Sequence, residues 1–162
     1  MIVIVCTGTP GTGKTALAKK LANDLKYDYV DVNKVIDDNK LIEEYDEKRN
    51  TYVVDEEKLS KILIIMIESG KNLVIDSHLA HYVPKANVDY CIVLKCDIKD
   101  LKERLERRKY SVEKIKENVD AEIFDVCLNE ALEFEHNIFI FDSSKLSVKE
   151  IIKKFKNETS LN

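Results

Sequence analysis

The sequence predicts an α/β fold in which a parallel five-stranded sheet is covered by helices on both faces. First, short apolar runs alternate with amphipathic segments along the chain, and this alternation is typical of parallel sheets. Second, the chain has 162 residues and is 44% hydrophobic, which is enough for one domain with its own core. Third, the opening apolar run is continuous, as in a strand whose two faces are both buried.

Each predicted strand is a short run of mostly apolar residues. Such runs are too brief for helices and too apolar for loops, so a buried sheet is the structure they favour. The predicted strands occupy residues 2–7, 29–32, 72–76, 90–96 and 137–141.

Apolar residues at helical spacing mark five helices between and after the strands. Leu17 and Leu25 belong to the stripe of the first helix, and Gly70 ends the second. The fourth is predicted as one long amphipathic helix whose stripe runs from Ile115 to Phe134. The predicted helices occupy residues 14–25, 56–69, 99–108, 115–134 and 148–155.

Residues 33–50 are polar and acidic, with only scattered apolar positions, and predict a mobile excursion from the sheet. No repeat, low-complexity segment or linker interrupts residues 1–162, which predicts a single domain. The apolar runs at residues 1–6 and 62–67 are too short to cross a bilayer, so we expect no membrane association and a cytoplasmic location. The four cysteines form no C-x-x-C pair and predict buried reduced thiols.

The formal net charge of −4 argues against strong direct binding to nucleic acid, because phosphate backbones attract positive surfaces.

Residues 8–15 read Gly-Thr-Pro-Gly-Thr-Gly-Lys-Thr and match the phosphate-loop pattern G-x-x-x-x-G-K-[ST] at every fixed position. The pattern lies between a predicted strand and a predicted helix, which is the context it requires. Successive backbone N–H groups and the helix N-terminus then form a positive concavity for phosphates. The spacing excludes the dinucleotide pattern G-x-G-x-x-G. The residues expected to bind ATP here are Gly11, Gly13, Lys14, Thr15 and Ala16.

Within this loop, Lys14 is expected to bridge the β- and γ-phosphates of ATP, and the hydroxyl of Thr15 to contact Mg²⁺. Asp76 ends an apolar strand, where proteins with this loop commonly hold Mg²⁺ or its water; the alternative is an ordinary capping aspartate. His78 follows closely and could orient water or relay a proton, or serve only a structural hydrogen bond. We interpret His81 and His136 as structural or solvated.

Three of the four arginines lie together in the predicted charged helix, and Arg49 lies apart. Arginine binds phosphate oxygens through a planar two-pronged fork. We expect Arg108, at the helix end, to contact the transferring phosphoryl group. For Arg104 a solvated face with neighbouring acids is the interpretation that we favour.

With these residues in view, the chain resembles the adenylate kinase family, and within it the atypical small enzymes of the coilin-interacting nuclear ATPase type. The resemblance covers most of the chain. It depends on three stretches: residues 7–15, the D-x-H motif at residues 76–78, and the arginine–tyrosine stretch at 104–110 with the Asn118-x-x-x-Glu122 motif after it.

The resemblance implies a P-loop nucleoside monophosphate kinase fold with a monophosphate insert at about residues 31–54 and a lid at about 107–117. It implies transfer of phosphate from Mg²⁺-bound ATP to AMP or another nucleoside monophosphate, with ATPase activity to which His78 is linked. It also implies a role in late maturation of the small ribosomal subunit through a ribosomal protein. In the family an arginine of the insert helix grips the monophosphate; here Lys34 is the available cation. The weaker resemblance of residues 142–145 places Lys145 near the adenine.

Two alternatives to this kinase remain open at the level of sequence. One is an assembly factor whose ATPase activity only gates the release of a protein partner. The other is a kinase of a small metabolite on the same scaffold. Acidic residues at 43–47 and 55–57 favour a basic small-subunit ribosomal protein as the partner, with the pre-small subunit contacted only transiently through it.

Overall fold

The computed structural model describes residues 1–47 and 51–161. Its main sheet has five strands in the order β2-β5-β1-β6-β7, and all four neighbouring pairs are parallel. Parallel neighbours place every carboxyl end at one edge of the sheet, where ligands of such folds bind. The strands are β1 (Val3–Thr7), β2 (Asp28–Asp31), β5 (Leu73–Asp76), β6 (Tyr90–Lys95) and β7 (Ile138–Asp142).

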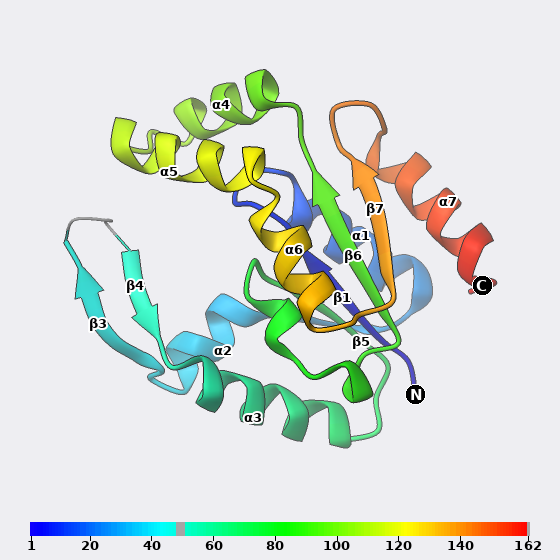
Figure 1. Cartoon of the computed structure of the whole chain (residues 1–162). Helices are drawn as coiled ribbons and strands as arrows, with labels where there is room; N and C mark the ends of the chain where they lie inside the picture. The colour runs from blue at the N-terminus through cyan, green and yellow to red at the C-terminus, as the bar shows by residue number, and fades with distance from the viewer. Residues whose placement is uncertain (48–50, 162) are drawn as a thin grey trace.

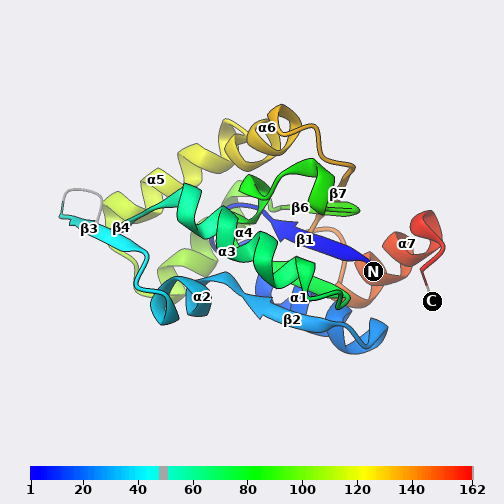
Figure 2. The same cartoon turned by 90° about the horizontal axis from the view of Figure 1, so that it is seen from below.

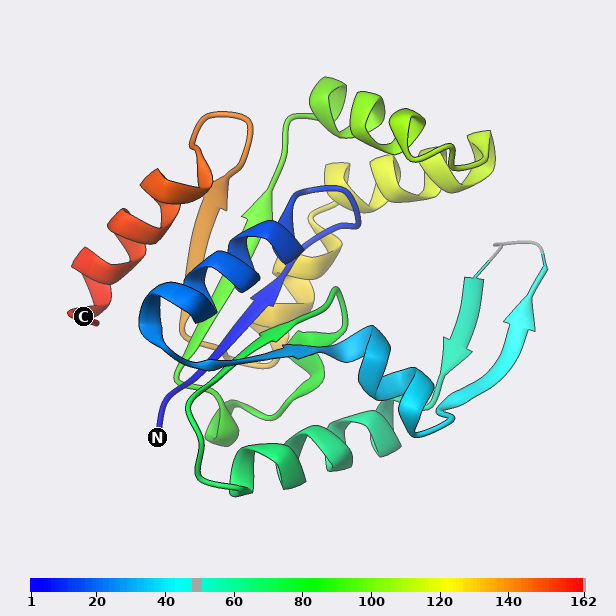
Figure 3. The same ribbon diagram turned by 180° about the vertical axis from the view of Figure 1, so that it is seen from behind.

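Helices cover both faces of this sheet, as predicted (Figures 1 and 3). One face packs against α1 (Lys14–Leu25) and α7 (Val148–Thr159), whose buried residues include Leu21 and Phe155. The other face packs against α3 (Glu56–Glu68) and α6 (Val126–Glu133), with Leu63 and Ala131 in its core. In strand β1 alternate side chains enter the two cores, which explains its unbroken apolar run.

The segment predicted as an excursion does leave the main sheet, and its described residues form a helix and a hairpin that were not predicted. Helix α2 (Val32–Asp38) begins where Asp31 accepts a hydrogen bond of 3.0 Å from the backbone of Asn33, and it buries Val35 and Ile36. Strands β3 (Ile42–Asp46) and β4 (Thr51–Val54) then pair as an antiparallel hairpin that projects away from the sheet (Figure 2). Their alternating and charged residues hid the hairpin from a reading based on apolar runs. Arg49 lies outside the described residues.

The long helix predicted from Ile115 to Phe134 is two helices, α5 (Val112–Ile123) and α6. The break falls at Asp125, whose φ of 54° is left-handed and stops the helical hydrogen bonds. The predicted apolar stripe also fails in part, because Ile123 is 55% exposed. Helix α5 packs against α4 (Ile98–Arg107) and reaches over the sheet edge instead of lying on the apolar core.

Two short 3-10 turns, η1 (Ala80–Tyr82) and η2 (Lys85–Asn87), link β5 to β6. In the described part of the chain, no helix combines the length and apolarity needed to cross a membrane.

Candidate functional site

The phosphate loop joins β1 to α1 at the carboxyl edge of the sheet, as predicted. Two of its glycines lie where a side chain would collide. A Cβ on Gly8 would lie 2.4 Å from the carbonyl oxygen of Leu94, and a Cβ on Gly11 would lie 2.9 Å from side-chain atoms of Leu101 and Leu105. Both also have positive φ angles, 140° and 97°, which L side chains rarely adopt. The loop is therefore locked against β6 and α4.

A cavity of about 580 Å³ opens above this loop. Its walls come from the loop, the segment after β5, the start of α2, the α4–α5 turn, α5 and α6. Predicted site residues Lys14, Thr15, Asp76, His78 and Arg108 all line it, although they are far apart in sequence. The volume is that of a typical ligand pocket.

Lys14 points back into the loop. Its Nζ donates a hydrogen bond of 3.3 Å to the backbone oxygen of Thr9. Burial lowers the pKa of Lys14, and the nearby carboxylate of Asp76 opposes this effect. The ammonium group is thus held beside the loop, facing the cavity.

Gly13 and Ala16 line a second, smaller cavity of about 260 Å³ next to the loop. Its walls also include Arg104, Ser143 and Leu146, from α4 and the segment after β7. The first turn of α1 contributes residues to both cavities. Lys145, by contrast, does not line this cavity, and its ammonium lies 3.1 Å from the carboxylate of Asp142.

Asp76 ends strand β5, where it pairs in register with Cys6 of β1 and Asp31 of β2. The carboxylate is only 5% exposed, and its Oδ2 accepts a hydrogen bond of 2.9 Å from the hydroxyl of Tyr29. Burial, together with this bond, raises the pKa of Tyr29 well above its ordinary value, so the phenol stays a donor. The carboxylate is thereby held in one orientation at the cavity wall.

His78 follows β5, is exposed and lines the cavity. Burial lowers the pKa of His78 to about 4, and the charges of Lys14 and Lys114 lower it further in the same direction. The imidazole is therefore neutral at pH 7 and can accept a hydrogen bond from a water molecule.

The three clustered arginines have different surroundings. Arg108 is exposed and lines the larger cavity. Arg107 is exposed on the outer face, with Nη2 3.6 Å from Glu103. The solvated role favoured for Arg104 was wrong. Its guanidinium is half-buried and donates to the backbone oxygen of Thr12 at 3.2 Å and to the hydroxyl of Ser143 at 3.0 Å.

Several cavity residues were not found from the sequence. They include Lys114 of α5 and Glu130 of α6, whereas Asn118 belongs to the motif noted in the sequence. Their signal was weak, because they occupy the polar positions of a stretch interpreted only by its apolar stripe. Lys34, the cation considered for the monophosphate, is exposed and does not line the cavity, whereas its neighbour Asn33 does.

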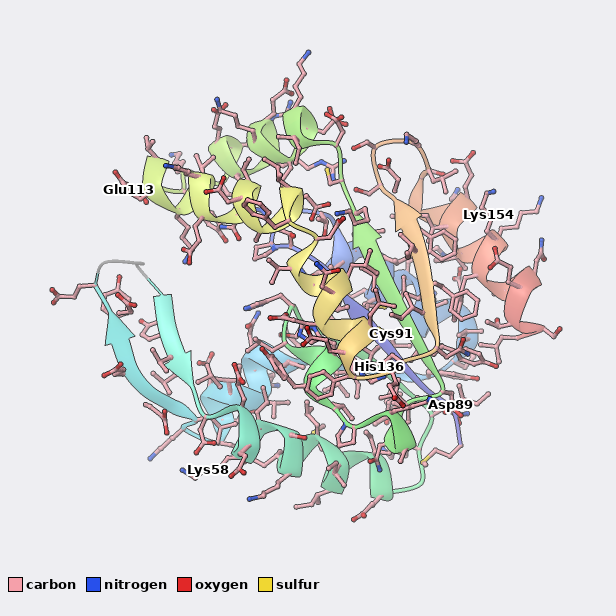
Figure 4. The ribbon with its side chains drawn as sticks, viewed as in Figure 1. Lys58, Asp89, Cys91, Glu113, His136 and Lys154 are labelled. Atoms are coloured by element: carbon pink, nitrogen blue, oxygen red, sulfur yellow. The ribbon has the colours of Figure 1, made fainter. Side chains whose placement is uncertain are left out.

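The other two histidines, His81 and His136, were expected to be either structural or solvated. Both are buried and structural. His81 is fully buried, with Nδ1 3.0 Å from the hydroxyl of Thr7 and Nε2 2.9 Å from Oε2 of Glu130. Burial lowers the pKa of His81 to about 4. His136 lies in the connection between α6 and β7 (Figure 4), and its Nε2 donates a 2.7 Å hydrogen bond to the backbone oxygen of His81.

The cysteines are free thiols, as predicted, and three of them are buried. Cys127 is half-buried and lines the larger cavity. Burial raises its pKa to about 11, so the group is a neutral thiol at pH 7 and a poor nucleophile.

The donors near the loop fit Mg²⁺ in a nucleotide complex. Mg²⁺ prefers oxygen ligands and is usually held by one or two carboxylates together with substrate phosphates. Asp76 and the hydroxyl of Thr15 supply oxygen atoms on the cavity wall beside the phosphate loop. Among the described residues, no three His, Cys, Asp or Glu side chains are grouped to hold a metal by themselves. The site thus suits a cation that arrives with phosphates.

Known proteins resemble this chain in both sequence and fold. A family model described as an AAA domain matches residues 4–125. The "Adenylate kinase isoenzyme 6 homolog" of Schizosaccharomyces pombe is 42% identical over 131 residues, which cover 81% of this chain and 74% of that protein. The "Adenylate kinase isoenzyme 6 homolog FAP7" of Saccharomyces cerevisiae is 40% identical over 139 residues, covering 85% and 70%.

Among solved structures, shikimate kinase from Bacteroides thetaiotaomicron superimposes with a TM-score of 0.64 and covers 99% of both chains. Its 19% identity makes this a likeness of fold. The predicted P-loop kinase fold is therefore confirmed.

Proposed function

We propose that this chain, which belongs to the adenylate kinase family and is a kinase, transfers the γ-phosphoryl group of Mg²⁺-bound ATP to AMP or another nucleoside monophosphate. This proposal depends on one observation: the same cavity is lined by Lys14, Asp76, His78 and Arg108. Phosphoryl transfer requires a loop that binds the phosphates, a carboxylate that helps to hold Mg²⁺, and an arginine that stabilises the transferring group.

The loop backbone, Lys14 and Arg108 have different roles in the proposed reaction. The backbone N–H groups of the loop and the ammonium of Lys14 bind and neutralise the phosphates. Arg108 approaches the transferring group from the α4–α5 turn and stabilises the charge that spreads over its equatorial oxygens. The smaller cavity beside Gly13, Ala16 and Arg104 is placed to receive the base of ATP.

Mg²⁺, when bound with ATP, would neutralise charge on the β- and γ-phosphates. Asp76, directly or through a water molecule, and Thr15 are the residues that would hold it. Tyr29 keeps the Asp76 carboxylate oriented for this task.

The phosphate of the acceptor nucleoside monophosphate needs a cation. Helix α2 contributes Asn33 to the cavity but no cation. Lys114, from α5, lines the cavity beside Arg108 and lies with its Nζ 5.5 Å from the ring centre of Tyr110. We propose Lys114 and Arg108, rather than Lys34, as the groups that face the monophosphate.

ATP hydrolysis is proposed as a second outcome at the same site. His78 is neutral at pH 7 and lies on the cavity wall with Lys14, where it can orient an attacking water. If hydrolysis dominates, the chain is an ATPase assembly factor with little kinase activity.

A role in small-subunit maturation, in the cytoplasm, is the biological part of the proposal. Glu43, Glu44 and Glu47 are exposed on β3 and the residue after it, on the projecting hairpin. A basic ribosomal protein would complement this surface. Of the second acidic cluster, Asp55 is already engaged, since it caps α3 and lies 2.7 Å from the ammonium of Lys58.

Two measurements test these proposals. The first follows ATP consumption and ADP formation with and without AMP: ADP appearing at twice the rate of ATP loss, only with AMP, identifies the kinase, whereas phosphate release without AMP identifies the ATPase. The second compares binding of a purified basic small-subunit ribosomal protein with binding of naked RNA at two salt concentrations. The comparison with RNA is necessary because a groove between α1 and α7 is lined by Lys149, Lys153 and Lys156. Such a basic groove attracts phosphate backbones.

A further inference from the structure

The buried side chains of helix α5 are polar. They are Asn118 and Glu122, which are 8% and 5% exposed. These two residues form the Asn-x-x-x-Glu motif of the sequence, and four residues along a helix places them on one face. Asn118 lines the cavity, but Glu122 does not. The proposed reaction therefore gives Glu122 no direct role.

Glu122 is fully engaged inside the protein. Its Oε2 accepts a hydrogen bond of 2.5 Å from the hydroxyl of Thr9, in the phosphate loop. Its Oε1 accepts one of 2.9 Å from the backbone N–H of Cys96, just after β6. The ammonium of Lys95 lies 3.3 Å from the same oxygen. A buried carboxylate is tolerated only with such compensation, and three partners fix its position firmly.

Thr9 links this carboxylate to Lys14. While its hydroxyl donates to Glu122, its backbone oxygen accepts hydrogen bonds from the Nζ of Lys14 at 3.3 Å and from the backbone and hydroxyl of Thr12 at 3.2 and 2.9 Å. A shift of Thr9 would thus move the oxygen that holds the Lys14 ammonium.

We propose that Glu122 is a positioning residue, which fixes the phosphate loop through Thr9 and so holds Lys14 where the transferring phosphate will lie. The inference rests on the proposed function in so far as Lys14 acts on a nucleoside triphosphate. The same helix also carries Lys114 and Asn118 into the cavity, so the groups that face substrate and the carboxylate that fixes the loop form one rigid unit.

Thr9 offers a matched pair of substitutions. Thr9→Val keeps the shape of the side chain and removes the hydroxyl donor, whereas Thr9→Ser keeps the donor. In Thr9→Val the loop N–H groups remain, so ground-state binding of ATP survives while the placement of Lys14 loosens. We expect turnover of ATP to fall by about tenfold in Thr9→Val, with KM for ATP within about twofold of the parent value. Thr9→Ser should restore turnover to near the parent value.

Glu122→Gln supplies the second half of a double-mutant cycle. If both residues act through one hydrogen bond, the double variant Thr9→Val/Glu122→Gln should turn over no more slowly than the worse single variant. Thermal unfolding of each variant separates a loss of folded protein from a loss of turnover per folded molecule. Unchanged turnover and KM in folded Thr9→Val would overturn the inference, as would a rise in KM at constant turnover.

A readout that does not depend on catalysis distinguishes failure of this inference from failure of the proposed function. The rate of Lys14 acetylation by acetic anhydride is followed by peptide mass spectrometry, with exposed Lys71 as internal reference. Acetylation of Lys14 should rise several-fold in Thr9→Val and not in Thr9→Ser. Equal rates in all three proteins would overturn the positioning role. A parent protein without ATP turnover would refute only the proposed function, and the acetylation rates would still decide the role of Glu122.

Discussion

The hydroxyl of Tyr29 donates a hydrogen bond of 2.9 Å to Oδ2 of Asp76, and so connects the edge strand β2 to the carboxylate beside the phosphate loop. A hydrogen bond from outside the metal's ligands orients a ligating group and commonly changes metal affinity ten- to a hundredfold. Tyr29→Phe keeps the ring and removes this bond. We expect the Mg²⁺ concentration for half-maximal turnover to rise about tenfold. Titration of Mg²⁺ at fixed ATP measures it, and an unchanged midpoint would contradict the role given to Tyr29.

Lys14→Ala should abolish both phosphoryl transfer and hydrolysis while leaving the fold intact. The variant removes the positive charge from the β- and γ-phosphates, and loss of such a charge costs roughly a hundred- to a thousandfold in turnover. Lys20→Ala is the matched control, because Lys20 lies on the same helix and pairs with Asp24 at the surface. Normal turnover in folded Lys14→Ala would refute the phosphate-loop assignment.

His78→Ala should lower ATP hydrolysis more than ATP affinity. The neutral imidazole is available to a water molecule at pH 7, because burial and the charges of Lys14 and Lys114 keep its pKa at about 4. Loss of the group that places a reacting water can cost about a hundredfold in rate. Single-turnover hydrolysis and nucleotide titration provide the comparison. If affinity falls and the hydrolysis rate of bound ATP does not, His78 has only a structural role.

Arg108→Lys should lower turnover by about tenfold although it keeps the charge, because the two-pronged guanidinium contact with phosphoryl oxygens is lost. Arg107→Lys is the control, since Arg107 is its neighbour, faces solvent and pairs with Glu103. Turnover and ATP affinity are measured for both. Equal activity of the two variants would show that Arg108 is a solvated side chain with no role in binding phosphate.

Acidification should destabilise the protein through His81. Its pKa is about 4 in the folded chain and about 6.5 in its ordinary state, so the unfolded chain binds the proton more tightly between these values. Stability from this residue is therefore present above pH 6.5 and is lost as the pH falls toward 4. The loss between pH 6.5 and pH 5 amounts to about 2 kcal/mol.

Urea unfolding of the parent and of His81→Gln at both pH values measures this effect. The variant should lose about 2 kcal/mol less than the parent on acidification. Burial raises the pKa of Glu130, which acts with the opposite sign and lies 2.9 Å from His81, so the difference between the two proteins reports on this pair of residues. Parallel pH profiles would show that His81 does not titrate on unfolding.

Much of the fold and part of the site were predictable from local sequence. The apolar runs located all five main strands to within a few residues, because strands buried on both faces have no alternative pattern. The hairpin β3–β4 was missed, since exposed residues such as Glu44 and Tyr45 leave only a weak signal. The helix break at Asp125 was missed as well, because apolar residues flank it on both sides and continue the pattern of the stripe across the break.

The sequence by itself determined the phosphate loop, because the loop's chemistry is local: three glycines, one lysine and three threonines lie within eight positions. Only the tertiary structure decided which distant groups join them. Thr9 and Glu122 are 113 residues apart in sequence and 2.5 Å apart between their oxygens. The burial of Arg104 against Thr12 and Ser143 likewise depends on how α4 packs over the loop. Such contacts are set by the order of strands and the packing of helices, which local patterns do not encode.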